Sequence, residues 1–181
     1  MNHDKDQGKS IVRHWLSILT ITSLALFPQT AQALPDDKDQ PIQLAANSAE
    51  MDDKKGISVY IGKVFLKQGS LEIEADKITI YSDEQGVKEI VAIGGPVKFR
   101  QQPKEKDPIT KGFASKVEYH ADTDQAIFTT NAKLVQGGDV ITGDQIKFDI
   151  EKDVATASSQ GKNKQVEMVI QPRKNKKTAK Q

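Results

Sequence analysis

The stretch Leu71-Glu72-Ile73-Glu74-Ala75-Asp76-Lys77-Ile78-Thr79-Ile80-Tyr81 alternates apolar residues with charged or polar ones. Because successive side chains of a β-strand point to opposite faces of the sheet, this alternation predicts a half-buried strand. After Asp76 the alternation slips by one residue, and Ile78 and Ile80 continue the apolar face. The slip predicts a bulge or bend that re-aims the face without ending the strand.

A second copy of this stretch lies 68 residues further along the chain. Without a gap, Leu66-Lys67-Gln68-Gly69 aligns with Leu134-Val135-Gln136-Gly137, and Asp76 aligns with Asp144. Weaker copies begin at Ala114 and Ala46. A strand-rich repeat predicts stacked β-units whose neighbours bury a common face. The alternative interpretation is chance similarity among strand-rich segments, and the ungapped agreement favours a true repeat.

The composition excludes some classes of function. The chain has 181 residues, with 26 Lys and Arg against 25 Asp and Glu, and this length suits one domain. The near-neutral balance argues against nucleic-acid binding through a global positive field. Cysteine is absent, which excludes disulfides, a thiolate nucleophile and zinc–cysteine sites.

The two ends of the chain differ from its middle. Residues 1–33 combine a basic head, an apolar run from Trp15 to Phe27 and the box Ala31-Gln32-Ala33. This pattern predicts a secretory signal peptide with cleavage after Ala33, and hence an exported protein. The run is shorter than the about 20 apolar residues that span a bilayer, and an uncleaved anchor is the alternative. Residues 173–181 form a basic tail without an apolar face, which we expect to be disordered.

The remaining residues, 34–172, are expected to form one all-β domain. Polar turns separate strand-like segments at fairly regular spacing, which predicts a sandwich, roll, barrel or β-solenoid. Gly62 is expected to mark a bulge, and Gly94-Gly95-Pro96 a break between two strands. Residues 125–130 and 132–136 are likewise expected to be separate strands. The first and last strands, 42–46 and 165–170, are candidate unprotected edges, and such edges pair with other strands.

The domain shows no recognisable catalytic or cofactor motif. Its one histidine, His120, is predicted to point outward beside Tyr119. Metal-ligand spacing, a nucleophile elbow and a glycine-rich phosphate loop are all missing, so we expect no enzyme, no metal and no cofactor. Glu72, Glu74 and Asp76 share one strand face and are interpreted as a solvated surface; a cation site is the alternative.

Medium-sized apolar residues are predicted to line one face of every strand. Such a protein either packs two sheets tightly or leaves a groove between them. A groove of Ile, Val and Phe suits acyl chains, because each buried CH2 contributes about 0.8 kcal/mol. The residues alone leave both arrangements open. The apolar positions are Ile42, Leu44, Ile73, Ile78, Ile80, Val97, Phe99, Val117, Tyr119, Ile127, Ile141, Ile146 and Phe148.

Several short motifs follow one another from residue 39 to residue 172 in a specific order and spacing. They are Asp39-Gln40-Pro41-Ile42-Gln43-Leu44, Gly62-Lys63-Val64, Gln68-Gly69, Ala75-Asp76-Lys77-Ile78, Gly95-Pro96-Val97-Lys98-Phe99, Gly112-Phe113-Ala114-Ser115 and Gly143-Asp144-Gln145-Ile146. With these motifs the chain resembles the OstA-like family of periplasmic lipopolysaccharide-transport proteins. Two departures concern local turn geometry: Thr130, where the family usually has Gly, and Asn47, where it usually has Asp.

The resemblance implies a fold, a cargo and partners. The fold would be an open-ended antiparallel β-jelly roll, V-shaped in section, whose hydrophobic groove carries lipopolysaccharide acyl chains. Head-to-tail stacking into a homo-oligomer is implied, with an LptC-like inner-membrane partner at the N-terminal edge and an LptD-like outer-membrane partner at the C-terminal edge. The implied lipid-binding positions are Ile42, Leu44, Phe99 and Tyr119, with Ile73, Ile78, Ile80 and Val117 behind them.

Two other classes of function compete with a lipid carrier. One is a periplasmic β-sandwich scaffold or carbohydrate-binding module without lipid cargo. The other is a periplasmic hydrolase. The small number of aromatic residues disfavours sugar binding on an exposed surface, and the single histidine of the domain disfavours a hydrolase.

Overall fold

The structure, a computed structural model, describes residues 37–102, 107–160 and 164–172. The predicted signal peptide, its cleavage after Ala33 and the basic tail lie outside the described residues. Within the described ranges the regular structure is one 3-10 turn, η1 (Asp37–Asp39), and β-strands. No helix in this part of the chain is long and apolar enough to cross a membrane.

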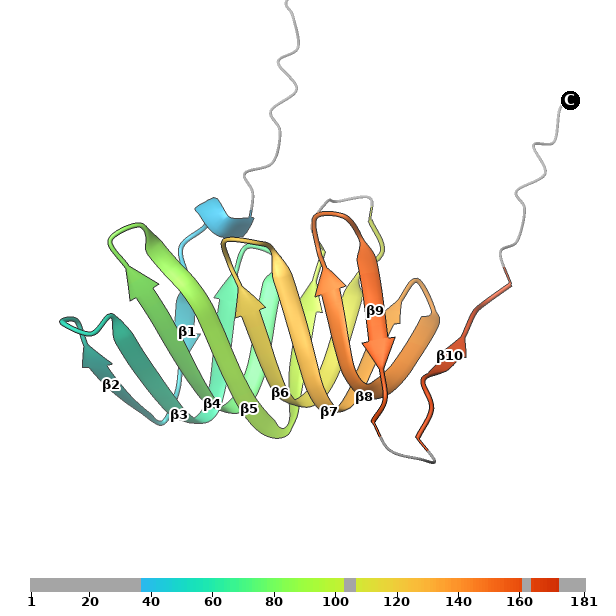
Figure 1. Ribbon diagram of the computed structural model, residues 1–181. Helices are drawn as coiled ribbons and strands as arrows, with labels where there is room; N and C mark the ends of the chain where they lie inside the picture. The colour runs from blue at the N-terminus through green and yellow to red at the C-terminus, as the bar shows by residue number, and fades with distance from the viewer. Residues whose placement is uncertain (1–36, 103–106, 161–163, 173–181) are drawn as a thin grey trace, which may run out of the picture. The chain divides into compact units, whose positions relative to one another are not determined.

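The described strands form a single antiparallel sheet (Figure 1). Its order is β1-β3-β4-β5-β6-β7-β8-β10, while β2 also pairs with β3 and β9 also pairs with β8. From β3 to β8 each strand pairs with its neighbours in sequence, so this part is a meander. The predicted all-β antiparallel class is confirmed. The strands are β1 (Gln43–Ala45), β2 (Ser48–Asp52), β3 (Ile57–Gln68), β4 (Leu71–Asp83), β5 (Gly86–Gln101), β6 (Thr110–His120), β7 (Gln125–Gln136), β8 (Asp139–Asp149), β9 (Val154–Ser158) and β10 (Glu167–Val169).

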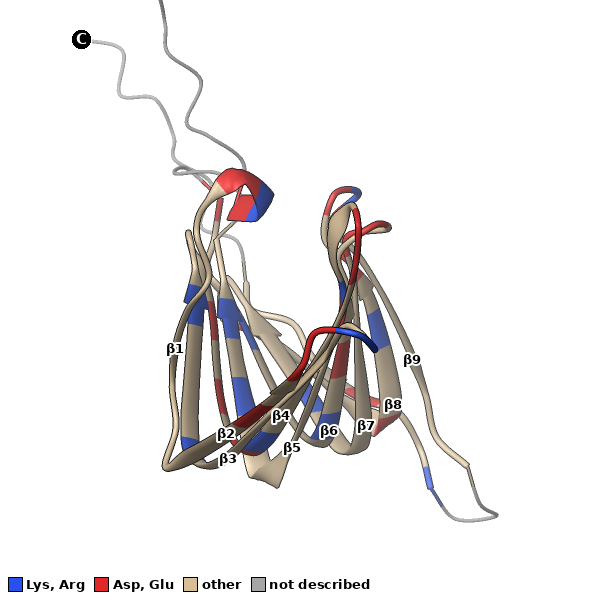
Figure 2. Ribbon diagram, turned by 90° about the vertical axis from the view of Figure 1, so that its left-hand side faces the viewer, with Lys and Arg blue, Asp and Glu red and all other residues tan. Residues whose placement is uncertain are grey.

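A row of irregularities crosses the long strands near their middles. A β-bulge bends its strand and increases the local twist. Placed side by side, these bulges fold the sheet into two arms, which Figure 2 shows edge-on from the side of β1 and β2. The register shifts lie between Ile61 and Val64, Glu74 and Lys77, Ile93 and Val97, Phe113 and Lys116, and Thr129 and Ala132.

Each long strand contributes one half to each arm. The first arm consists of β1, β10 and the half-strands 64–68, 71–75, 97–101, 110–114, 132–136 and 139–143. The second arm consists of β2, β9 and the half-strands 57–61, 77–83, 86–93, 116–120, 125–129 and 145–149. The hydrophobic core lies between the arms. Hydrophobic side chains of both arms are fully buried there, including Leu66 and Ile73 of the first arm and Ile78 and Phe128 of the second.

The predicted slip within β4 is confirmed. Leu71, Ile73 and Ala75 are buried, Asp76 and Lys77 are both exposed, and burial resumes at Ile78 and Ile80. The register shift between β4 and β5 falls at the same point. The bulge therefore keeps the apolar side of the strand facing inward in both arms.

Two predicted strand breaks are wrong. β5 runs continuously through Gly94-Gly95-Pro96, where the Gly95–Pro96 peptide bond is cis, and β7 runs continuously through Thr130-Asn131. In both cases the glycine, proline or left-handed residues form a bulge, because pairing with the same neighbouring strand resumes on the far side. The bulge of β5 is also held by Asp76, whose Oδ2 accepts a hydrogen bond from the Gly95 N–H at 3.2 Å.

One predicted inward position is also wrong. Ile127 lies on the outer side of β7 and is half-exposed, while its neighbours Ala126 and Phe128 are fully buried. The small Ala126 faces inward opposite Phe148 of β8. The prediction favoured Ile127 only because it is apolar. Which residues of β7 face inward is set by the bulge at Thr130-Asn131, further along the strand.

The predicted repeat is also a structural repeat. The hairpin β3–β4 and the hairpin β7–β8 carry their register shifts at equivalent places, and Gly69 and Gly137 both have φ of 57°. At the bulge, Gly62 and Lys63 have φ of 85° and 48°, and the equivalent Thr130 and Asn131 have φ of 65° and 55°. The two copies therefore bend by the same backbone conformation, although glycine is present in only one of them.

Thr130 is expected to be a strained position. A β-branched residue rarely adopts positive φ, and such strain costs about 1–3 kcal/mol. We predict that Thr130→Gly stabilises the protein by about 1 kcal/mol, after the greater freedom of glycine in the unfolded chain is subtracted. Urea unfolding measures this.

The reciprocal substitution is the control. Gly62→Thr places a Cβ 2.7 Å from Nδ2 of Asn47 at a positive φ, and we expect it to destabilise the protein. A loss of stability in Thr130→Gly would contradict the strain argument.

Candidate functional site

All eight predicted lipid-binding residues face the interior between the arms. Six of them are buried, with Ile80 the most exposed at 6%. The set divides equally between the two arms, so the predicted residues face one another across the interior. Ile42, Leu44, Ile73 and Phe99 belong to the side of the first arm, and Ile78, Ile80, Val117 and Tyr119 to the second arm.

Ile42 and Leu44 have a different environment from the other six. They are only half-buried, and they pack against the margin of the core where β1 closes the N-terminal end of the sheet. Leu44 pairs with Leu66 of β3. These two positions therefore lie at an end of the interior, where the apolar surface continues to the free edge of the sheet.

Aromatic contacts tie the arms together. The rings of Phe99 in the first arm and Phe128 in the second meet edge to face, with centroids 5.3 Å apart. Such pairs contribute about 0.5–1.5 kcal/mol beyond their burial. Gly112 of the first arm makes room for the same ring, because a Cβ there would collide with Phe128. The interior is thus a filled core in this structure, which answers a question that the sequence left open.

Sequence reasoning missed part of this interior. Phe128 was not predicted, because the apolar Ile127 beside it was favoured. Leu66, Ile90 and Leu134 are also buried but were not named as inward. Gly112 was quoted only as part of a motif. The signal for its role is the pairing of Gly112 with Phe99 across β5 and β6, which places it beside the ring that meets Phe128 and requires knowledge of the register.

The charged residues Glu72, Glu74 and Asp76 of β4 lie on the outer face, as predicted, although apolar side chains such as Ile61 and Ile93 are exposed there as well. Lys67 Nζ lies 2.9 Å from Glu72 Oε1, and Lys98 Nζ lies 2.8 Å from Glu74 Oε2. These cross-strand pairs interact in solvent, where an ion pair contributes little to stability. Among the described residues no group of three or more His, Cys, Asp or Glu side chains is arranged to hold a metal ion.

The open side of the bend, opposite the bulges, is crossed by polar contacts. We call this side the mouth; it lies between the rims of the two arms. η1 is held to the first arm by Asp37, whose Oδ1 accepts the Ser70 N–H at 2.6 Å and whose Oδ2 accepts Gln101 Nε2 at 3.2 Å. From there Lys38 Nζ reaches Asp124 Oδ2 of the second arm at 3.1 Å.

A second contact crosses the mouth further along. Gln136 Nε2 of the first arm donates a hydrogen bond to Asp153 Oδ1, beyond the end of β8 in the second arm, at 2.6 Å. Together with Lys38–Asp124, this contact joins the rims of the two arms. Both are exposed or half-exposed polar contacts, whose individual free energies are small. They hold the two rims of the mouth together only weakly.

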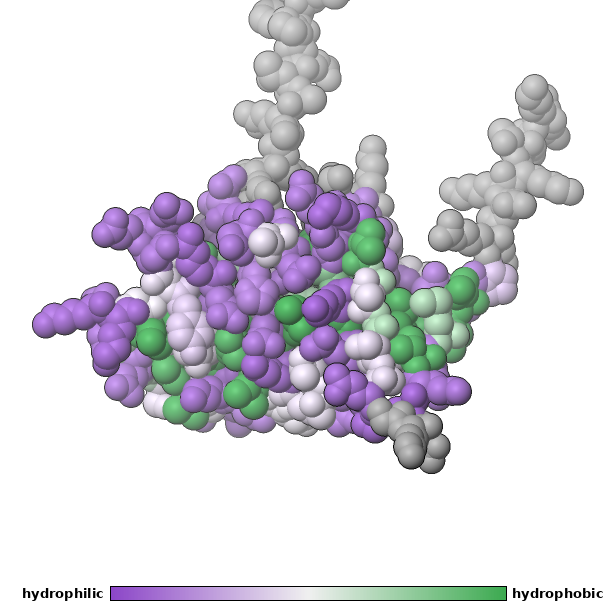
Figure 3. All heavy atoms as spheres, in the orientation of Figure 1, coloured by the Kyte–Doolittle hydropathy of each residue, from purple (hydrophilic) through white to green (hydrophobic). Residues whose placement is uncertain are grey.

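Each edge of the sheet carries one short strand per arm. At the N-terminal edge these are β1 and β2, and at the C-terminal edge they are β10 and β9. Large apolar side chains are exposed at both, including Met51 at 65% and Ile170 at 66%. Figure 3 shows hydrophobic residues gathered around β10. The two predicted edges are therefore present, and both retain strand backbone and apolar surface for pairing.

The crossing from β9 to β10 is anchored by Asp144. Its Oδ1 accepts Lys164 Nζ at 2.7 Å, and its Oδ2 accepts the Gln160 N–H at 2.8 Å. The hydrogen bond from Lys164, followed by that from Gln160, lowers the pKa of Asp144. The carboxylate therefore remains charged down to acidic pH, and the anchor weakens only as the pH falls through that lowered pKa.

The bent open sheet, with its apolar interior and two free edges, is an open-ended antiparallel β-roll. The family model described as LptA/(LptD N-terminal domain) LPS transport protein matches residues 43–154. The chain belongs to this family.

Named relatives agree with this assignment. The lipopolysaccharide export system protein LptH of Pseudomonas aeruginosa is 32% identical over 157 residues, covering 83% of this chain and 90% of LptH. LptA of Haemophilus influenzae is 33% identical, covering 84% and 90%. LptA of Escherichia coli K12 is 31% identical, covering 87% and 85%.

A solved structure agrees as well. The crystal structure of LptH from Pseudomonas aeruginosa, described as the LptA-homologous periplasmic component of a lipopolysaccharide transport device, superposes with a TM-score of 0.72. The identity is 30%, and the match covers 76% of this chain and 100% of that one.

Adding a side chain at Gly112 is expected to push the two arms apart. We predict that Gly112→Ala destabilises the protein by about 2 kcal/mol, the cost of overpacking a filled core. In a Phe128→Ala background the same substitution should cost much less, because the ring that it meets is gone. Urea unfolding of both single variants and the double variant measures the difference. Equal losses in both backgrounds would show that Gly112 does not fit against Phe128.

Proposed function

We propose that this protein carries lipopolysaccharide across the periplasm, with the acyl chains between the two arms and the sugars in water. The observation that carries the proposal is that all eight family-matched positions face one continuous apolar interior, contributed by both arms. Family membership supports the choice of cargo. The scaffold alternative is not favoured, since the relatives are named as lipopolysaccharide export proteins.

The filled interior determines how loading occurs in this proposal. Acyl chains enter only if the arms separate and the contacts between them, such as Phe99–Phe128, are exchanged for contacts with lipid. Hydrophobic burial is non-directional, so an acyl chain replaces a facing side chain with little loss of free energy. The weak polar contacts across the mouth open first. Carriage is passive, and the energy for movement comes from other components.

Site-specific photo-crosslinking tests the cargo. A photoreactive residue at Phe99, which is 1% exposed, is expected to label lipopolysaccharide, because bound acyl chains must pass this position. The matched probe at Glu72 lies on the outer face of the neighbouring β4 and should not label. Labelling at neither site in a folded protein would mean that the interior stays a packed core, and the carrier function would then be rejected.

We further propose head-to-tail stacking. In the first arm, β1 runs antiparallel to β3 and β10 runs antiparallel to β8, and the intervening meander makes β1 and β10 run in opposite directions. The same holds for β2 and β9 in the second arm. A copy placed beside the first in the same orientation therefore continues the antiparallel alternation in both arms, and the two interiors join.

The same edges support the proposed partners. An LptC-like inner-membrane protein would pair with β1 and β2, and an LptD-like outer-membrane protein with β9 and β10. Strand addition of this kind obtains affinity from backbone hydrogen bonds and specificity from side-chain pockets. The periplasmic location rests on the family and on the predicted signal peptide.

Removing β10 tests the stacking. A chain that ends at residue 160 presents β8 at the first-arm edge, and β8 runs in the same direction as β1 of the next copy. We predict that this variant stays monomeric over a concentration range in which a chain ending at residue 172 grows in mass. Analytical ultracentrifugation measures the mass of both chains. The chain that ends at residue 172 lacks only the tail and is the control. Equal growth of both chains would exclude β10 from the interface.

A further inference from the structure

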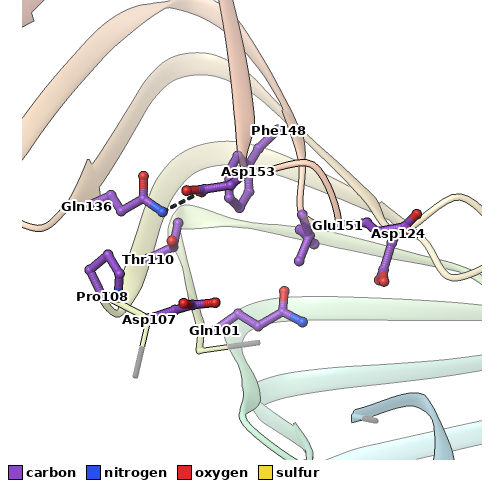
Figure 4. A pocket seen from close by; sticks show the side chains of 10 residues that line it. Gln101, Asp107, Pro108, Thr110, Asp124, Gln136, Phe148, Glu151 and Asp153 are labelled. Atoms are coloured by element: carbon purple, nitrogen blue, oxygen red, sulfur yellow. Dashed lines mark hydrogen bonds between the residues drawn. The ribbon is translucent and has the colours of Figure 1, made fainter. Parts of the chain in front are cut away.

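A cavity lies in the mouth between the two polar contacts that cross it. Its volume is about 320 Å³, at the lower end of the range of small-molecule sites. Gln101, Thr110 and Gln136 line it from the first arm, and Asp124 and Asp153 from turns of the second. Figure 4 shows these side chains converging from both sides. The cavity is therefore built by both rims.

The floor of the cavity is apolar and continuous with the interior. Phe148 is 2% exposed and Ile150 is 4% exposed, and both belong to the hydrophobic core. A molecule whose acyl chain lies between the arms would thus pass beside Phe148 on its way to the mouth. The cavity is placed where the polar head of such a molecule begins.

Two buried polar atoms in the lining have no hydrogen-bond partner. They are Oε1 of Gln101 and Oγ1 of Thr110, in residues that are 3% and 1% exposed. Buried polar groups are nearly always satisfied, because leaving one without a partner is unfavourable. The Gln101 side chain is fixed in place by its Nε2, which donates to Asp37, so its oxygen is presented in one orientation. Once the rims separate to admit a lipid, as the carrier function requires, a ligand with hydrogen-bond donors satisfies both atoms.

The charge of the lining selects among such ligands. The described lining residues include Asp107, Asp124, Glu151 and Asp153, and no described lining residue is Lys or Arg. Asp124 is paired with Lys38 beside the cavity, so the negative charge comes mainly from the other three. A phosphate in this cavity would be repelled by the carboxylates. Hydroxyl and amide groups, in contrast, donate to carboxylates in charge-assisted hydrogen bonds. The cavity therefore suits the donor groups of a sugar and not the anionic groups of a lipid head.

We propose that this mouth cavity binds the hydroxyl and amide donors of the sugar headgroup of the lipid whose acyl chains lie between the arms. The inference rests on the proposed carrier function and refines it: the sugar next to the acyl chains is held in the cavity, while the sugars beyond it stay in water. Bound there, the sugar orients the lipid with its phosphates outward. Thr110 and Gln101 fix the position of the sugar ring. The carboxylates repel the phosphates of a headgroup bound in the opposite orientation.

The test compares two amphiphiles with twelve-carbon chains, dodecyl glucoside and dodecanoate, below their micellar concentrations. Each displaces a fluorescent fatty acid from the full chain. Thr110→Val removes the buried hydroxyl and keeps the shape of the side chain. We expect it to weaken dodecyl glucoside about fivefold, the effect of one lost hydrogen bond, and to leave dodecanoate unchanged. Thr79→Val, at a half-buried outward position of β4, is the matched control and should change neither.

The outcomes separate the subsite from the carrier function. If both amphiphiles bind and Thr110→Val changes neither or changes both equally, the subsite is rejected while the carrier function stands. If neither amphiphile displaces the probe and the probe itself does not bind, the carrier function fails and the subsite fails with it. A glucoside effect that is seen only after Mg²⁺ is added would also reject the sugar subsite, because the cavity would then be a cation site.

Discussion

The row of bulges across the middle of the sheet is the constraint on which the rest of the structure depends. A flat meander of these strands would expose its apolar face to water. Because every long strand bends at the same level, the face folds onto itself and buries residues such as Ile73 and Ile78 without a second sheet or a covering helix. The core, the mouth and the pairing of the edges all follow from this bend.

The bend also means that few connections hold the two arms together. In a closed sandwich the two sheets are held by many connections, whereas here the arms are joined along one line and meet elsewhere through side chains. The polar contacts at the mouth, Lys38–Asp124 and Gln136–Asp153, are individually weak. In the proposed carrier function, the residues that form the core of the isolated domain are also the residues that contact the acyl chains.

Local patterns predicted much of this structure, and longer-range ones did not. The slip after Asp76 identified a bulge because the parity of burial is visible within one strand. The breaks expected at Gly94-Gly95-Pro96 and at Asn131 were wrong, because whether such residues end a strand or form a bulge in it depends on pairing with a neighbouring strand. Phe128 was missed for the same reason. The mouth could not be predicted, since Gln101 of the first arm and Asp153 of the second are brought together only by the bend.

The number of strands has a consequence for how such a domain can change in size. Each arm contains eight strands, and an even number makes its two outermost strands run in opposite directions. Gain or loss of a single strand would make the two outermost strands of an arm run in the same direction, so that they could no longer pair antiparallel with a neighbouring copy. Gain or loss of a hairpin would keep their directions opposite. The repeat of 68 residues spans the four strands from β3 to β6 before it begins again at β7. A duplication of that unit would lengthen the domain and leave the match between its two ends intact.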